Sequence, residues 1–164
     1  MIVSNSTILI YLAKIGQLNL LKVLFKKILI PKEVFSEVVL KGKELQHPDA
    51  LVVEKAVEDG WIEVKEIESC DELEEFGIDA GEAQAISLAL SVNVPVLLDQ
   101  THARIAAKAF GLKPNGTIFV LLVALKKGLL TCEEYQDQLE ELVKVGFRMS
   151  DEVYLAAVRL GRKK

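Results

Sequence analysis

Residues 78–104, IDAGEAQAISLALSVNVPVLLDQTHAR, decide the fold because they predict a helix followed by a strand, with one acidic residue at an end of each. Glu82 opens a segment whose apolar residues suit a largely buried helix. Asp99 follows the run 94–98, which is short, bounded and rich enough in β-forming residues for a buried strand. Ligands of parallel α/β sheets bind outside the carboxyl ends of the strands, so Asp99 is well placed for chemistry.

Both acids also have a purely structural interpretation. Asp79 and Glu82 have the three-residue spacing of a capping box, and Asp99 or Thr101 could cap a helix expected at residues 101–110. Taken alone, each acid is better explained as a cap than as a catalyst, because most helices carry caps. The local pattern leaves both alternatives open.

The composition predicts one acidic domain. The chain has 164 residues, of which 51% are hydrophobic, and this length suits one well-packed domain. Lys and Arg number 20 against 24 Asp and Glu, giving a net charge of −4, so any polyanion site must be local. Cys70 and Cys132 are too few for a zinc site or a disulfide framework and suit a reducing compartment. With no leader and no apolar run of ~18 residues, we expect a soluble cytoplasmic protein and no membrane association.

Helical and strand patterns alternate along the chain with short connections. Strands are expected at 1–4, 28–30, 61–67 and 94–98, and helices at 8–15, 17–25, from Pro31 onward, and at 50–59, 101–110, 118–126, 131–145 and 150–160. Residues 41–49 are expected to form a loop, and residues 61–67 an edge strand. This order predicts an α/β fold with a mainly parallel sheet covered on both faces, followed by a helical ending.

Two further polar residues stand near expected element ends. Asn5 ends the first strand, as Asp99 ends a later one. On the helix that Pro31 opens, Glu33 points away from the apolar stripe, whereas Glu37 lies closer to its edge and could turn inward. No dinucleotide-binding glycine pattern, P-loop or nucleophile elbow is present, so these classes lose their main sequence support.

Several motifs in order resemble those of PIN-domain proteins, and specifically a prokaryotic branch related to VapC-type toxins. The motifs are IVSNST at 2–7, PKEVFSEV at 31–38, GEAQAISLA at 81–89, LLDQTHAR at 97–104, GT at 116–117 and VGFRMS at 145–150. Each motif alone is weak, but together they span nearly the whole chain.

The resemblance implies a three-layer α/β/α Rossmann-like PIN domain over residues 1–164, with a core at about 1–127 and a helical extension at about 128–164. It also implies cleavage of single-stranded RNA with Mg²⁺ or Mn²⁺, and it raises the expectations of an antitoxin partner and a homodimer. The four positions that carry acids in the family fall on Asn5, Glu37, Glu82 and Asp99. The resemblance implies that all four bind the metal and that Glu37, Glu82 and Asp99 are also catalytic. Ser6, Thr7 and Thr117 are the implied polar neighbours and substrate contacts. Arg104, one helical turn beyond Asp99, could contact a substrate phosphate or form an ion pair within the acidic cluster.

Asn5 departs from the family pattern, which has Asp at this place. An amide offers one carbonyl oxygen but no charge, so the sequence predicts weak nuclease activity or none. Two alternatives remain open: a non-catalytic PIN-fold module that binds RNA or protein, and an α/β ligand-binding or regulatory domain whose acids are all helix caps.

Overall fold

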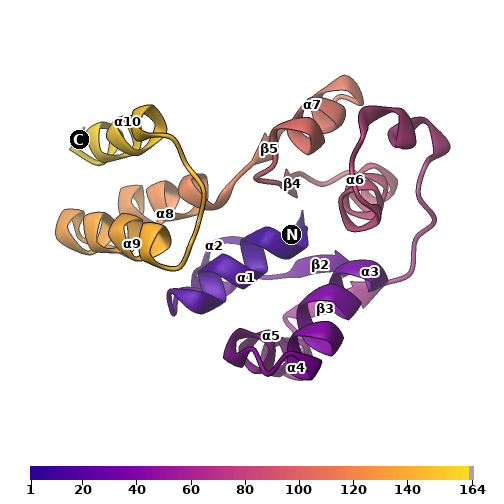
Figure 1. Cartoon of the computed structure of the whole chain (residues 1–164), viewed down its shortest axis with the longest axis horizontal. Coiled ribbons are helices and arrows are strands. Elements are labelled where there is room, and N and C mark those ends of the chain that lie inside the picture. Colours follow the sequence, from indigo (N-terminus) through magenta and orange to yellow (C-terminus); the bar gives the residue numbers. More distant parts are fainter. Residues whose placement is uncertain (163–164) are drawn as a thin grey trace.

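Five parallel strands form one sheet in the computed structural model, which describes residues 1–162 (Figure 1). The strands are β1 (Ile2–Ser4), β2 (Ile28–Pro31), β3 (Ile62–Lys65), β4 (Val96–Leu97) and β5 (Pro114–Asn115), in the order β3-β2-β1-β4-β5. The expected edge strand, β3, lies at one end of this order. Lys163 and Lys164, which fall in the expected C-terminal extension, lie outside the described residues.

Strand order reverses at β1, which pairs with β2 on one side and with β4 on the other. Val3 is the partner of Leu29 in β2 and of Val96 in β4. In open parallel sheets, the carboxyl ends of the strands at such a reversal border the usual ligand crevice. Asn5 and Asp99, which follow these two strands, therefore stand at this edge of the sheet.

Alternating strand residues bury into two separate cores, because successive side chains of a strand point to opposite faces. Ile2, Ile28 and Leu97 belong to one core, whereas Val3 and Leu29 belong to the other. Helices cover both faces, which confirms the predicted three-layer α/β/α architecture.

The helices divide between these two cores. The first core includes residues of α1 (Ser6–Lys14), α2 (Asn19–Phe25), α3 (Lys32–Phe35), α5 (Pro48–Glu58), α8 (Thr117–Lys126), α9 (Cys132–Lys144) and α10 (Asp151–Arg162). The second includes residues of α6 (Ala80–Val92), α7 (Thr101–Ala109) and the 3₁₀ helix η2 (Asp71–Phe76).

The expected loop at 41–49 is wrong for six of its nine residues, which are helical. Helix α3 runs directly into a π-helical turn, η1 (Ser36–Leu40), and then into α4 (Lys41–Glu44), while α5 already begins at Pro48. The turn back is tight because Gly42 packs on Ala50; a Cβ at Gly42 would lie 2.8 Å from the Ala50 Cβ. Pro31 differs by one residue from its expected first helical position, since it pairs with Lys65 in β3 and precedes α3.

Helices α8, α9 and α10 form a group of their own at the C-terminal end, shown in orange to yellow in Figure 1. Tyr135 of α9 is fully buried, and its hydroxyl donates to the Ala157 carbonyl of α10 at 2.9 Å. The division of the domain near residue 127 stays a prediction. Within residues 1–162, every helix is too short or too polar to cross a membrane.

Candidate functional site

A small pocket lies beyond the carboxyl end of β1, and we call it the acid pocket. It is lined by Asn5, Ser6, Thr7, Glu37, Asp79, Gly81, Glu82 and Gln100. Its volume of about 20 Å³ has room for roughly one water-sized particle. Three of the four implied metal ligands therefore line one pocket, together with Ser6 and Thr7.

Asn5 contributes a buried oxygen to the acid pocket. The residue is the N-cap of α1 and is only 2% exposed. Its Nδ2 donates to Gln100 Oε1 at 3.4 Å, whereas its Oδ1 has no hydrogen-bond partner. An unpaired buried carbonyl oxygen costs about 1 to 3 kcal/mol, so this atom is available to a donor or a cation.

Glu82 contributes a second such oxygen while also capping α6. The backbone N–H of Glu82 donates to Asp79 Oδ1 at 2.7 Å, and the Asp79 N–H donates to Glu82 Oε1 at 3.1 Å. The predicted capping box is thus confirmed. It uses only one oxygen of Glu82, because Oε2 is buried and without a hydrogen-bond partner. Capping and ligand binding are therefore compatible in the same side chain.

Burial raises the pKa of Glu82 above its usual value, and the nearby charges of Asp79 and Glu37 act in the same direction. A carboxyl whose folded pKa is raised destabilises the fold once it ionises. The folded protein gains stability from the neutral Glu82 carboxyl at a pH below the pKa that Glu82 has in the unfolded chain. This stability is lost as the pH rises through the higher pKa that Glu82 has in the folded protein. The metal-free protein therefore carries a penalty at neutral pH.

We expect Glu82→Gln to raise the melting temperature of the metal-free protein at pH 7. Glutamine keeps the capping geometry, because Gln also serves at the third position of a capping box, but it removes the buried charge. The gain should shrink toward zero as pH falls below about 4.5, where the wild-type carboxyl is itself neutral. Thermal unfolding followed across this pH range measures the effect.

Helix α9 supplies a matched control. Thr131 and Glu134 form the same capping box there, but Glu134 is exposed. Glu134→Gln should leave the melting temperature at pH 7 nearly unchanged, because it removes no buried charge. Equal effects of the two substitutions would show that Glu82 carries no burial penalty.

Glu37 reaches the acid pocket from the π-helical turn. Its side chain is exposed to solvent, yet its Oε2 accepts a hydrogen bond from Ser6 Oγ at 2.9 Å. Single π turns occur frequently at functional sites, because the extra residue changes the direction in which a side chain leaves the helix. Ser6 thus holds Glu37 on the side of Asn5.

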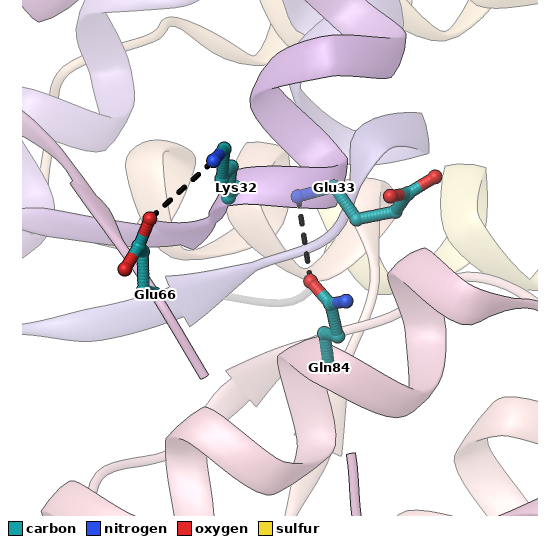
Figure 2. A network of polar contacts seen from close by, with 4 residues as sticks. All are labelled: Lys32, Glu33, Glu66 and Gln84. Carbon is teal, nitrogen blue, oxygen red and sulfur yellow. Dashed lines mark hydrogen bonds and ion pairs between the residues drawn. The ribbon is translucent and has the colours of Figure 1, made fainter. Parts of the chain in front are cut away.

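Polar contacts join the start of α3 to α6 and to the segment that follows β3, as Figure 2 shows. Gln84 Oε1 accepts the backbone N–H of Glu33 at 3.3 Å, and Lys32 Nζ lies 3.4 Å from Glu66 Oε1. Helix α3 has no side-chain cap of its own, so Gln84 serves in that place. Gln84 lies two residues after Glu82, and Glu33 lies four residues before Glu37. The bond between them therefore fixes the two acid-bearing segments relative to each other.

Asp99 does not line the acid pocket, and its side chain is hydrogen-bonded to the first residue of α8. Its Oδ1 accepts the Thr117 N–H at 2.8 Å, and its Oδ2 accepts the Thr117 hydroxyl at 2.7 Å. The expectation that Asp99 or Thr101 caps α7 is wrong, since Gln100 occupies that N-cap without a side-chain bond. Burial raises the pKa of Asp99, while the Thr117 hydrogen bonds and the charge of Arg104 act against that shift.

The oxygen atoms of the acid pocket fit a small hard cation. Among residues 1–162, no three His, Cys, Asp or Glu side chains are arranged to hold a metal ion by themselves. Asn5 Oδ1 and Glu82 Oε2 are nevertheless unpaired oxygens in one pocket, with Glu37 at its edge. Magnesium prefers oxygen ligands and keeps several waters, so a few protein oxygens suffice.

Sequence reasoning missed two residues around this site. Gln100 bridges Asn5 and Thr7, because its Nε2 also donates to Thr7 Oγ1 at 3.0 Å. Its place directly after Asp99 was the only available signal. Arg148 lies within the VGFRMS motif, and it lines a neighbouring cleft with Asp99 and Gln100.

Comparison with known proteins identifies the family of the chain. A family model described as a PIN domain matches residues 1–162. The chain shows no significant match to a curated protein or to a solved structure.

Proposed function

The chain belongs to the PIN-domain family, and from that premise we propose that it is a ribonuclease that hydrolyses phosphodiester bonds of single-stranded RNA with Mg²⁺ or Mn²⁺. The observation that carries the proposal is the pair of unpaired buried oxygens, Asn5 Oδ1 and Glu82 Oε2, in one pocket beside Glu37. Uncompensated oxygens of this kind are costly unless a ligand binds them.

In this proposal, Glu37, Glu82 and the Asn5 carbonyl hold the ion. When bound, such an ion lowers the pKa of a water and neutralises charge on the phosphoryl oxygens. Ser6 keeps Glu37 oriented through their 2.9 Å hydrogen bond. No protein nucleophile is required.

Asp99 is proposed as a further catalytic and metal-binding residue on the strength of the family resemblance. The hydrogen bonds from Thr117 fix its carboxylate at the start of α8, and Arg104 lies beside it. Thr7, Arg104 and Thr117 are proposed to contact the substrate. Thr7 is the best placed of these three, because it lines both the acid pocket and the adjoining cleft.

Titration with Mn²⁺ tests the proposal. A ligand that binds only the folded state stabilises it by RT ln(1 + [L]/Kd), which is about 1.4 kcal/mol at ten times Kd. For a chain of this size, that stabilisation raises the melting temperature by about 3 to 6 °C. Glu37→Gln should reduce the rise and any metal-dependent cleavage of labelled single-stranded RNA.

Glu33→Gln is the control, because Glu33 lies one helical turn earlier and outside the acid pocket. It removes the same charge and should leave the Mn²⁺ response as in wild type. If the melting temperature of the wild-type protein does not change on adding Mn²⁺, the proposal is contradicted. That result would favour the alternative of an α/β ligand-binding or regulatory domain whose acids serve only as helix caps.

Asn5 favours one second candidate, a non-catalytic PIN-fold module that binds RNA or protein. The Asn5 side chain brings no charge, and its Nδ2 is bonded to Gln100. Divalent binding and the support for an ionised water are both weaker without a carboxylate there. RNA binding without cleavage at any metal concentration would identify this candidate.

We also propose, from the resemblance, that the protein is a cytoplasmic toxin with an antitoxin partner and that it forms a homodimer. Exposed apolar side chains on the C-terminal helices, among them Val153, Leu155 and Leu160, support a protein interface there. Sedimentation velocity distinguishes the dimer from a monomer.

A further inference from the structure

An open cleft adjoins the acid pocket, and we call it the arginine cleft. It is lined by Thr7, Tyr11, Asp99, Gln100, Thr101, Phe147 and Arg148, and its volume is about 540 Å³. Thr7 and Gln100 also line the acid pocket. The two hollows therefore meet at the hydrogen bond between these side chains.

Arg148 supplies the uncompensated positive charge of this cleft. Its side chain is exposed and forms no ion pair within the part of the chain that the structure describes. The other charged residue of the cleft, Asp99, accepts two hydrogen bonds from Thr117, and the positive charge of Arg104 acts on it from nearby. Arg148 is thus a cation without an ion-pair partner among the described residues, on a chain whose net charge is −4.

The loop that carries Arg148 is held in place on both sides. The Tyr11 hydroxyl donates to the Gly146 carbonyl at 3.3 Å, and the Tyr11 and Phe147 rings meet edge to face with centroids 5.1 Å apart. The Phe147 N–H donates to the Leu142 carbonyl at 2.9 Å. Ser150 Oγ then accepts the Val153 N–H at the start of α10. Arg148 is therefore presented on a fixed turn.

Two helices also begin at the arginine cleft. Thr7 lies in the first turn of α1 and Thr101 is the first residue of α7, and neither helix has a side chain that caps its first turn. The amino ends of helices carry partial positive charge, so they add to the attraction that Arg148 exerts on an anion.

Resting on the proposed ribonuclease function, we propose that the arginine cleft is a substrate subsite in which Arg148 binds a backbone phosphate of single-stranded RNA next to the scissile bond. The planar guanidinium can donate two hydrogen bonds to one phosphate. Thr7 and Gln100 then lie between the bound phosphate and the acid pocket. Tyr11 acts as a positioning residue through its bond to Gly146.

Fluorescence anisotropy with a labelled single-stranded oligoribonucleotide tests the subsite, with EDTA present so that binding is measured without cleavage. Arg148→Gln should weaken binding about tenfold at low salt, and the slope of log K against log salt should fall by about 0.7, the value for one phosphate contact with a single strand. Arg148→Lys should retain the slope, because it keeps the charge. Arg159→Gln removes an exposed arginine of α10 that lines neither the acid pocket nor the arginine cleft, so it should behave as wild type.

The outcomes of this experiment distinguish failure of the subsite proposal from failure of the proposed ribonuclease function. If wild type cleaves RNA but Arg148→Gln binds as tightly and with the same slope, the subsite is wrong while the proposed function stands, and Arg148 faces another partner such as an acidic protein. RNA binding that depends on Arg148 without any cleavage supports the subsite and overturns the nuclease. Wild-type protein that neither binds nor cleaves RNA overturns both.

Discussion

Asn5→Asp is expected to tighten Mn²⁺ binding by more than tenfold and to increase cleavage of single-stranded RNA. The substitution replaces Nδ2 by an oxygen of similar size, so the fold needs no rearrangement. The Gln100 amide can turn to donate to the new carboxylate instead of accepting from Asn5. Even with the screening of water, a divalent ion about 4 Å from one added charge gains about 2 kcal/mol, and 1.4 kcal/mol is a factor of ten.

The same substitution should lower the stability of the metal-free protein. It adds a carboxylate at a position only 2% exposed, in a pocket that Glu37 and Glu82 already share. Like charges and burial both disfavour ionisation there. The signature of a metal site is therefore a lower melting temperature with EDTA combined with a larger rise on adding Mn²⁺.

Calorimetric Mn²⁺ titration and a cleavage assay measure these changes, and Asn19→Asp controls for the added charge. Asn19 is exposed at the start of α2 and does not line the acid pocket. It should change neither quantity. If Asn5→Asp leaves Mn²⁺ affinity and cleavage as in wild type, position 5 faces no metal, and the non-catalytic binding module becomes the better account.

The features that sequence predicts well are those carried by local patterns. Runs such as residues 94–98 predict buried strands, and the spacing of Asp79 and Glu82 predicts the capping box that the structure contains. The strand ends at Asn5 and Asp99 follow from the same patterns. These features depend on neighbours within a few residues, so periodicity and capping rules suffice to find them.

Features that depend on distant contacts could not be predicted in this way. Asp99 caps α8, 18 residues away, although the local pattern favours α7. The π turn around Glu37 shifts a side chain by one residue, which a regular helical wheel does not represent. The bond of Gln84 to the Glu33 N–H spans 51 residues. Each of these contacts is set by how the elements pack, and one sequence carries no record of that packing.

The second large effect is expected on stability, from a substitution at Gly116. The Asp99 carboxylate that is bonded to α8 leaves no room for a side chain at this position. Gly116 has an extended backbone with φ −111°, which any residue can adopt. A Cβ there would lie 2.5 Å from Asp99 Oδ1 and 3.2 Å from Arg104 Nη1. The need for glycine at this position is therefore one of space, and it accounts for the GT pair at 116–117.

Gly116→Ala is expected to destabilise the protein by about 2 to 3 kcal/mol, from overpacking together with loss of the hydrogen bonds to the buried Thr117. This corresponds to a melting temperature lower by about 5 to 10 °C in thermal unfolding. Gly81→Ala is the control: its Cβ would meet Glu37 Oε2 at an ordinary 3.4 Å, and alanine favours a helix, so stability should be kept or increased.

A double-mutant cycle identifies the clash as the cause. Asp99→Ala removes the carboxylate that the new Cβ would strike, so Gly116→Ala should cost much less in that background than in wild type. Contacting residues are non-additive in this way, whereas independent sites add within about 0.5 kcal/mol. Additive effects would mean that Gly116 acts through something other than Asp99, and the fixed position of this carboxylate at the start of α8 would then need another explanation.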